Sequence, residues 1–377
     1  MKKKIIIIGS GIAGLTLANF FKCCSEYEYV IYEKEDSLNL NEGYGIQLSV
    51  NSVSIINKLG FNKLNNADKY NPSSLDFYSA SKNKICNLDL TKFNNDINKY
   101  TTLKRSILIK FLREELFSNS IKFGKILNDI EQVGKKIIVK FKDGASDEAD
   151  YVVVSDGVFS SSKNIIEKTQ KKPNYYGSIA IRTKVSNELT SSFDSKNISV
   201  IMCSNAHIVL YPVNQLKEMN LVCIIKKKLD TQVPLKLTLD KIILNKYPAL
   251  SNLFKGNLKS WPIYTSKTPF KSKYKNIFYI GDSFYTFPPS MAQGASQSIE
   301  SAKELFELII EEKENIQDRY FNNRIARIKQ IKNRSSFNYF TFQLSNPLFI
   351  FLRNLIIKFA LKNKTFCEFY LGRVFRK

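Results

Sequence analysis

Three short groups of glycine and acidic residues lie far apart in this chain, and each follows an apolar run. The first is Gly9-x-Gly11-x-x-Gly14, which directly follows Ile5–Ile8 and opens a stretch with helical periodicity. Gly9 permits a tight turn, Gly11 lets a pyrophosphate approach the backbone, and Gly14 lets a helix pack closely on a sheet. The N-terminus of that helix presents free N–H groups, which favour phosphate.

An acidic residue closes the second apolar run of the same stretch. Glu33 lies nineteen residues after Gly14, where its carboxylate can accept hydrogen bonds from a ribose hydroxyl and disfavours a 2′-phosphate. Strand, glycine turn, helix and acid occur together, as a dinucleotide-binding βαβ unit requires. We therefore expect a dinucleotide site here, to which Ile12, Ala13 and Lys34 also belong.

The other two groups also follow apolar runs. Asp156-Gly157 comes after 151–154, and Gly281-Asp282 comes after 276–280. An open α/β sheet keeps its ligand at the carboxyl ends of its strands, so all three groups belong at one edge. Arg105 lies near the start of a helix expected over 101–117. A cation there suits an anion or a polar cofactor edge, with a solvated arginine as the alternative.

The composition is that of a folded protein with many basic residues. Among 377 residues, 57 Lys and Arg against 34 Asp and Glu give a formal net charge of +23, and 44% are hydrophobic. Lys, Asn and Ile are abundant throughout, so a general bias explains the charge as well as a nucleic-acid or membrane partner does. No RNA-binding motif or helix-turn-helix pattern occurs, so we expect no nucleic-acid partner.

The cysteines and the single histidine argue against a metal centre. The six cysteines include no C-x-x-C pair, and His207 is the only histidine, so we expect no metal. We expect the cysteines to be small core residues in a reducing cytoplasm. The sequence shows neither a signal-peptide pattern nor a transmembrane span, and the expected location is cytoplasmic.

Strand-like and helical runs indicate an α/β protein with two interleaved domains. The expected architecture is a discontinuous Rossmann-like domain, an inserted, mainly antiparallel β-sheet domain that binds the substrate, and a basic C-terminal helical segment. Their expected ranges are 1–71, 100–175 and 266–320 for the first, 72–99 and 176–265 for the second, and 321–377 for the third.

The C-terminal segment mixes apolar and basic residues. It holds twelve Lys or Arg and one acid, Glu368. Such a segment either caps the protein's own core or lies on a membrane surface, where its cations meet anionic headgroups. The second alternative would place the protein peripherally on the inner membrane surface. The sequence leaves both open, as it does the oligomeric state.

The three groups, in their order and spacing, resemble the single-component FAD-dependent aromatic hydroxylases, typified by para-hydroxybenzoate hydroxylase. In the third group, Gly281-Asp282 is followed by Pro289 and Gln293-Gly294, as in that family. The run 45–48 and Arg105 make the chain most similar to the salicylate and urate hydroxylase branch. The likeness covers about residues 1–300.

This resemblance implies a Rossmann-like FAD-binding domain with non-covalent FAD, NAD(P)H as a transient co-substrate, and O2. It implies a monooxygenase that hydroxylates an aromatic, hydrophobic or otherwise electron-rich small molecule through a flavin C4a-hydroperoxide. Asp282 would bind the ribityl hydroxyls, Arg105 the ribityl–phosphate stretch, and Asp156 with Gly157 both FAD and the nicotinamide approach. The remaining implied cofactor residues are Gly45, Gln47, Gly281, Pro289 and Gln293, with Gly294 and Ala295 at the pyrimidine edge.

Three residues are catalytic candidates. His207 is a general base for a phenolic substrate or a hydrogen-bonded structural residue. Arg182 pairs with a substrate carboxylate or is solvated. Tyr285 replaces the histidine that usually ends the family's Gly-Asp-Ala-Ala-His motif, and it begins an apolar loop that extends to Met291. That loop forms a water-excluding substrate wall or packs only on its own helix.

Two other functions fit the same motifs. One is a flavin oxidoreductase that acts on a quinone or polyprenyl-type substrate without inserting oxygen. The other is a flavin-binding protein without catalysis. Oxygen uptake stimulated by a substrate, with an oxygenated product, distinguishes the monooxygenase from both.

Overall fold

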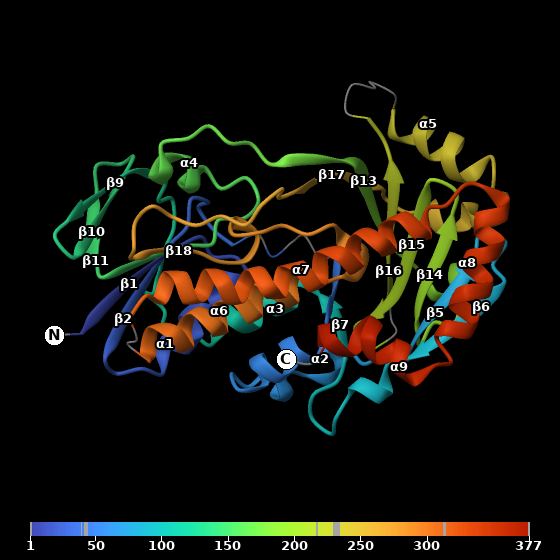
Figure 1. The fold of residues 1–377 in the computed structure, drawn as a ribbon, viewed down its shortest axis with the longest axis horizontal. Helices are drawn as coiled ribbons and strands as arrows, with labels where there is room; N and C mark the ends of the chain where they lie inside the picture. Colours follow the sequence, from blue (N-terminus) through green and yellow to red (C-terminus); the bar gives the residue numbers. More distant parts are fainter. Residues whose placement is uncertain are drawn as a thin grey trace.

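The computed structural model describes residues 2–38, 40, 44–215, 218–228, 234–311 and 314–375. Two large sheets lie side by side, and the long helix α7 (Ile316–Phe342) passes across both (Figure 1). The N-terminal strands belong to one sheet, and the middle of the chain supplies most of the other.

The first sheet is the expected Rossmann-like sheet. Its five strands pair in the order β18-β12-β1-β2-β8, all parallel, and the central strand β1 carries the buried isoleucines 5–8. Helix α1 (Ile12–Lys22) contacts both α3 (Arg105–Glu114) and α6 (Gly294–Ile310). The strand bounds are β1 Lys3–Ile8, β2 Tyr27–Tyr32, β8 Ile121–Lys122, β12 Tyr151–Val154 and β18 Ile277–Tyr279.

Seven strands form the second sheet, in the order β17-β13-β16-β15-β14-β5-β6. Every pair is antiparallel except β14 with β5, so the sheet is mainly antiparallel, as expected. One face packs against α5 (Leu235–Leu239) and the turns that follow it. The strand bounds are β5 Ser74–Ser79, β6 Lys84–Asp89, β13 Asn174–Val185, β14 Ile198–Cys203, β15 Ala206–Val213, β16 Glu218–Lys226 and β17 Lys259–Thr265.

Two small antiparallel sheets complete the fold. One joins β9 (Leu127–Val133), β10 (Lys136–Phe141) and β11 (Ser146–Ala149). The other, β3-β7-β4, packs against the seven-stranded sheet: Gly45 N–H donates to Asn220 Oδ1 at 2.7 Å, and the Thr102 hydroxyl donates to the Pro212 carbonyl at 2.6 Å. Its strand bounds are β3 Gly45–Leu48, β4 Lys69–Tyr70 and β7 Thr101–Lys104.

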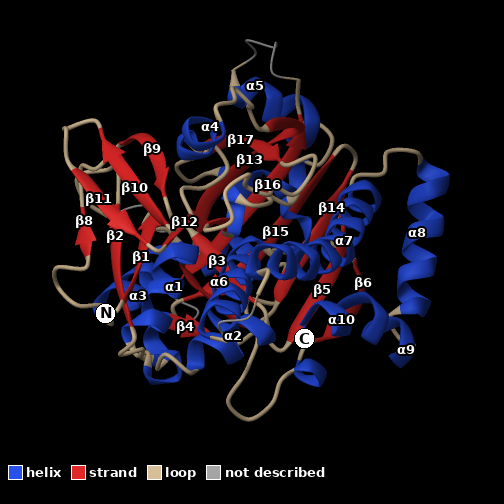
Figure 2. Ribbon diagram, turned by 60° about the vertical axis from the view of Figure 1, so that its left-hand side comes forward, coloured by secondary structure: helices blue, strands red, loops and turns tan. Residues whose placement is uncertain are grey.

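The α/β fold class with an inserted antiparallel sheet is therefore confirmed (Figure 2). Local boundaries differ from the expected ones. The helix expected over 101–117 begins at Arg105, because 101–104 pair with β3 as strand β7. The position of the domain boundaries along the chain stays a prediction.

The C-terminal segment divides into two parts with different environments. Beyond Leu361, the short helices α9 (Lys364–Cys367) and α10 (Arg373–Phe375) pack into the core, and Val374 and Phe375 are buried. Helix α8 (Pro347–Ala360) instead leaves most of its apolar side chains exposed. Arg376 and Lys377, counted among the twelve basic residues, lie outside the described residues. No helix in the described ranges has the length and hydropathy needed to cross a membrane.

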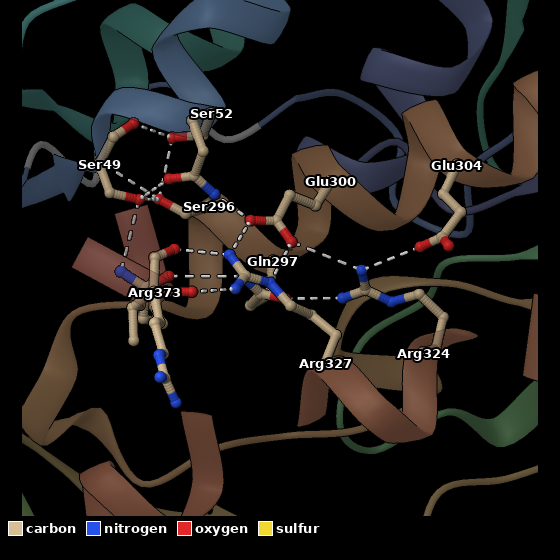
Figure 3. A network of polar contacts seen from close by, with 12 residues as sticks. Ser49, Ser52, Ser296, Gln297, Glu300, Glu304, Arg324, Arg327 and Arg373 are labelled. Carbon is tan, nitrogen blue, oxygen red and sulfur yellow. Dashed lines mark hydrogen bonds and ion pairs between the residues drawn. The ribbon is translucent and has the colours of Figure 1, made fainter. Parts of the chain in front are cut away.

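A buried ionic network fixes the core-packed part of the C-terminus (Figure 3). Glu300 of α6 accepts two hydrogen bonds from Arg327 of α7, at 2.7 and 2.9 Å, and is also paired with Arg324 at 3.5 Å. Arg327 donates in addition to the carbonyls of Arg373 at 2.8 Å and Val374 at 2.5 Å. The network therefore joins α6, α7 and the end of the described chain.

Arg327→Met should lower the free energy of unfolding by about 3 kcal/mol, because it leaves Glu300 buried without its best partner and frees two C-terminal carbonyls. Limited proteolysis should then cut the C-terminal segment faster than in the original protein. Urea unfolding and proteolysis together measure both effects.

Arg319→Met is the matched control, because Arg319 lies on the same helix and its pair with Glu311, at 3.5 Å, is largely exposed. Its effect should stay within about 0.5 kcal/mol. Equal effects of the two substitutions would show that the buried network does not hold the C-terminus.

Candidate active site

The first glycine group forms a cradle at the carboxyl end of β1. Gly9 has a φ of +102°, and a Cβ there would lie 2.8 Å from the Ser155 carbonyl oxygen. A Cβ on Gly14 would lie 2.2 Å from the Gly9 carbonyl oxygen. Gly11 is extended, with a φ of −77°, and the nearest atom to its Cβ position is 3.8 Å away. Gly9 and Gly14 are thus needed for packing, while the space beside Gly11 is open to a ligand.

That open space lies at the N-terminus of α1, whose first residues are Ile12 and Ala13. The backbone N–H groups there and the helix dipole suit a pyrophosphate. Glu33 stabilises the turn from the other side, because its Oε2 accepts hydrogen bonds from the Ser10 N–H at 2.8 Å and the Ser10 hydroxyl at 2.6 Å. A contact from Glu33 to a ribose stays a prediction. Lys34 is exposed and pairs with Glu35 at 3.5 Å.

The second and third groups meet the first at this edge. The Asp156-Gly157 turn contacts Gly9, since a Cβ on Gly9 would lie 2.9 Å from the Asp156 Cα. A Cβ on Gly281 would lie 2.9 Å from the Ala13 Cβ, which places Gly281 beside the start of α1. Strands β1, β12 and β18, which precede the groups, are neighbours in the sheet. The three groups that are separated in the sequence therefore form one continuous surface.

The two aspartates of this surface have perturbed acidities. Burial raises the pKa of Asp156, against the hydroxyls of Ser160 and Ser162, which lower it. Its Oδ2 accepts from the Ser162 N–H at 3.2 Å, and Oδ1 has no hydrogen bond to another described residue. Burial raises the pKa of Asp282 to about 6, and the positive charge of Arg105 opposes the rise. Both carboxylates have acceptor capacity for the hydroxyls of a sugar or ribityl chain.

A cavity of about 330 Å³ adjoins Asp282 and extends toward the seven-stranded sheet. Residues from three parts of the chain line it. The flavin-type motifs supply Gly45, Gln47, Asp282, Pro289, Gln293, Gly294 and Ala295; the sheet supplies Arg182, Ile198, Val200, His207, Val209, Tyr211, Val222 and Ile224; the C-terminal helices supply Asn338, Phe342, Tyr370, Leu371 and Phe375. Seven of the expected cofactor residues and two of the three catalytic candidates thus share one cavity, whereas the first glycine group and Asp156-Gly157 are not part of its lining.

Arg182 is held on the cavity wall by aromatic rings. Its guanidinium carbon lies 5.9 Å from the centre of the Trp261 ring and 6.0 Å from that of Tyr44. These two rings meet edge to face at 5.1 Å. Arg182 also lowers the pKa of Tyr211, against the larger raising effect of burial. A guanidinium that lies beside two aromatic rings can orient an anionic or strongly polar substituent in the cavity.

His207 is fully buried, and burial lowers the pKa of its imidazole to about 3, so the ring is neutral. Gln343 places its amide nitrogen 2.9 Å from Nδ1 and 3.5 Å from the Ile224 carbonyl oxygen. An amide nitrogen that donates to both acceptors leaves the ring proton on Nε2. That atom has no hydrogen-bond partner among the described residues, although the residue lines the cavity.

The apolar loop after Asp282 lies only partly where we expected it. Phe287, Pro288, Pro289 and Met291 line the cavity, whereas Tyr285 is not among the described residues that do so. Tyr285 is buried in the core and packs against the Phe287 ring at 4.9 Å. Its N–H donates to the Gly281 carbonyl at 3.1 Å, so Tyr285 belongs to the helical turn that begins at Gly281. The family's histidine position is therefore a packing position here.

Sequence reasoning missed several lining residues. Tyr211 shares a strand face with His207, and the two-residue period of a strand could have found it. The C-terminal residues Asn338, Tyr370 and Phe375 carried no such signal. They reach the cavity only because α7 and the turns that follow it fold back over the seven-stranded sheet.

Gly11→Val should prevent FAD binding without unfolding the protein, because the side chain would fill the space meant for the pyrophosphate. Gly14→Val should instead destabilise the fold, since its side chain meets the Gly9 backbone. Flavin fluorescence titration and thermal unfolding of the apoprotein measure the two effects. Normal FAD affinity of Gly11→Val would contradict the assigned cradle.

A second prediction concerns pH. Burial raises the pKa of Asp282 from 3.8 to about 6. The free energy of unfolding of the apoprotein should therefore fall as the pH rises from 3.8 to about 6, because the unfolded chain ionises this carboxyl group more readily. FAD hydroxyls that donate to the carboxylate would need it ionised. FAD affinity should therefore fall about tenfold per unit of pH below that value.

Asp282→Asn should weaken FAD binding at neutral pH, remove this pH dependence and raise the apoprotein's melting temperature. FAD titrations and melting curves across the pH range measure all three effects. An unchanged pH profile in the variant would show that Asp282 does not hold FAD through its carboxylate.

Comparisons with known proteins agree with this arrangement. The chain is 24% identical over 356 residues to the FAD-dependent monooxygenase atnA of Arthrinium sp, with 83% of this chain but only 45% of that relative aligned. It is 23% identical to 6-hydroxynicotinate 3-monooxygenase of Bordetella bronchiseptica, with 92% and 94% aligned. The chain thus spans about half of the first relative and nearly all of the second.

Solved structures share the fold. HpxO of Klebsiella pneumoniae, complexed with FAD and uric acid, superposes with a TM-score of 0.82 at 16% identity, covering 98% of this chain and 97% of that one. The profile of the family described as "FAD binding domain" matches residues 2–335, which include all three motif groups. This match confirms the resemblance drawn from the motifs: the chain belongs to the FAD binding domain family.

Proposed function

We propose that this protein is an FAD-dependent monooxygenase that uses NAD(P)H and O2 to hydroxylate a flat, electron-rich ring. The observation that carries the proposal is one cavity lined both by the third motif group, from Asp282 to Ala295, and by polar residues of the antiparallel sheet. An enzyme of this kind needs the ring to be held beside the flavin and away from water.

Bound FAD would supply the activation of O2, with electrons from NAD(P)H; the chain's own residues bind, orient and shield. Gly294 and Ala295 begin α6, where backbone N–H groups and the dipole of a 17-residue helix stabilise negative charge. Gln47 lies across the cavity and accepts a hydrogen bond from the Tyr100 hydroxyl at 2.7 Å. These groups suit the polar edge of an isoalloxazine ring.

His207 and Arg182 would orient the substrate. A neutral imidazole with its proton on Nε2 donates a hydrogen bond and does not take up a proton, so we assign His207 to donation toward a ring oxygen or nitrogen. Arg182 would pair with a carboxylate or with the negative charge of a phenolate. The structure thus favours a binding role for His207 over the general-base role considered from the sequence.

The rest of the wall is apolar and would exclude water from the reacting ring. Phe287, Pro288 and Met291 lie on one side, and Val209, Val222 and Ile224 of the sheet line the other part. Relatives bear names that fit such a site: one acts on 6-hydroxynicotinate, and HpxO was solved with uric acid. Both compounds are flat rings with polar substituents.

The test is a panel of carboxylated, hydroxylated and neutral aromatic and heteroaromatic compounds. A suitable ring should accelerate NAD(P)H oxidation and O2 uptake and yield a hydroxylated product. Arg182→Met should weaken binding of carboxylated rings by about tenfold or more and leave neutral analogues nearly unchanged. NAD(P)H oxidation that yields a reduced product without oxygen insertion would favour the quinone or polyprenyl reductase.

Met291→Lys should raise the share of NAD(P)H that ends as H2O2, because a charge in the apolar wall draws water toward the flavin. Met291→Leu is the matched control and should keep the original coupling, since it preserves volume and polarity. Product and H2O2 are measured against NAD(P)H consumed. If the lysine variant stayed as well coupled as the leucine variant, this loop would not shield the reaction.

A further inference from the structure

Helix α8 leaves its apolar surface uncovered. Besides Pro347, ten of its fourteen residues have apolar aliphatic or aromatic side chains. Among them, Phe351 and Ile356 are 64% and 65% exposed. Phe337 and Phe340 of α7 extend the same kind of exposure, at 59% and 62%. Figure 2 shows α8 at the right-hand edge, projecting from the body of the protein. So much exposed apolar surface marks an interaction site.

An apolar groove lies between α8 and α7. Its cavity measures about 440 Å³, and Phe337, Phe340, Phe349, Leu352 and Ile356 line it, all of them also exposed at the surface. The only charged side chain among its described lining residues is Arg353, which donates to the Thr341 carbonyl and to Asn354. The groove therefore offers a continuous apolar path from the surface inward.

The groove ends against the active-site cavity. Asn338, Phe342 and Tyr370 line both spaces, so these three side chains form the partition. The Tyr370 hydroxyl donates to Asn338 Oδ1 at 2.7 Å, and the Asn338 amide donates weakly to the Ser290 carbonyl at 3.4 Å. A ligand that spans both spaces would have to displace these three side chains.

Basic residues accompany the exposed surface. Lys358 lies on α8, Lys362 and Lys364 follow it, and all three are exposed. Within 321–375 the sole acid is Glu368. Arg334 and Arg373 lie over the exposed Phe369 ring, at 4.9 and 5.6 Å. An apolar surface bordered by cations complements the apolar interior and anionic headgroups of a lipid bilayer.

We infer that α8 binds the surface of an anionic membrane, and that the groove between α7 and α8 admits a lipophilic ring substrate from that membrane to the flavin cavity. A second copy of this chain is a poorer occupant. Pairing two α8 surfaces would bring both sets of lysines together, on chains that each carry a formal charge of +23. The substrate part of this inference rests on the proposed function, whereas the membrane part does not.

The membrane part is tested by sedimentation with vesicles of equimolar phosphatidylcholine and phosphatidylglycerol, and of phosphatidylcholine alone, using the FAD-loaded protein. The protein should sediment with the anionic vesicles, much less with the neutral ones, and less at high salt. The double variant Phe351→Asp/Phe359→Asp should bind at least about tenfold more weakly.

Phe117→Asp is the control, since Phe117 is equally exposed at 62% but follows α3, far from α8 in Figure 2. It should bind vesicles as the original protein does. Equal binding by the original protein and the double variant, or none by either, would overturn the inference. So would a dimer that the double variant dissociates, because a second copy would then cover α8.

The groove is tested in detergent-free solution without vesicles, by the change that phenol and 4-hexylphenol cause in the flavin absorption spectrum. The hexyl chain should tighten binding by about tenfold or more. Leu352→Trp, which fills the groove outside the active-site cavity, should remove that gain and leave phenol binding unchanged. Leu237→Trp, at an exposed leucine of α5, should retain it.

An equal gain in Leu352→Trp would overturn the groove as the route. A wrong proposed function would be recognised separately from the vesicle-binding and groove results. In that case vesicle binding would persist, while no ring compound would stimulate NAD(P)H oxidation or yield an oxygenated product.

Discussion

The carboxylate of Glu300 is shared by two arginines in the protein interior, and the arrangement of the active site depends on it. Glu300 lies in α6, the helix whose first turn carries Gly294 and Ala295. Through Arg327 it also holds the carbonyls of Arg373 and Val374. A buried charge that lost these partners would be costly, so helix α6, helix α7 and the C-terminus keep fixed positions.

The second constraint is close backbone packing at the ends of β1, β12 and β18. Gly9, Gly14 and Gly281 each lie where a Cβ would strike backbone or side-chain atoms, and Gly11 alone of the first motif borders open space. The requirement for glycine therefore has two separate causes: packing at three positions and ligand access at one. The surface that results has an uncovered helix N-terminus and two carboxylates, which suits the phosphates and hydroxyls of FAD.

The sequence predicted the fold and the meeting of the three motif groups at one sheet edge, because their signals are local. A β-branched run, a glycine turn and an acid at fixed spacing identify a βαβ unit without knowledge of long-range contacts. The substrate side was harder. Tyr285 was assigned by its position after Asp282, but it is buried in the core and does not line the cavity. Asn338, Tyr370 and Phe375 reach the cavity only through the return of the C-terminal segment, which periodicity does not reveal.

The C-terminal segment shows the same limit in another form. Its composition permitted a core cap or a membrane-surface helix, and the structure shows one buried part and one exposed part. The turns after Leu361 pack into the core and are bound by Arg327, while α8 stays exposed. The sequence could not separate them, because both parts carry the same mixture of aromatic and basic residues.

The central claim, that the protein inserts oxygen into a ring bound beside FAD, is tested most directly by turnover under isotopically heavy oxygen gas. Mass spectrometry of the product then shows the origin of the new oxygen atom. The account predicts a product that carries one heavy oxygen atom from the gas for each hydroxyl formed. A product whose new oxygen comes from water, or a product without new oxygen while NAD(P)H is consumed, would contradict it.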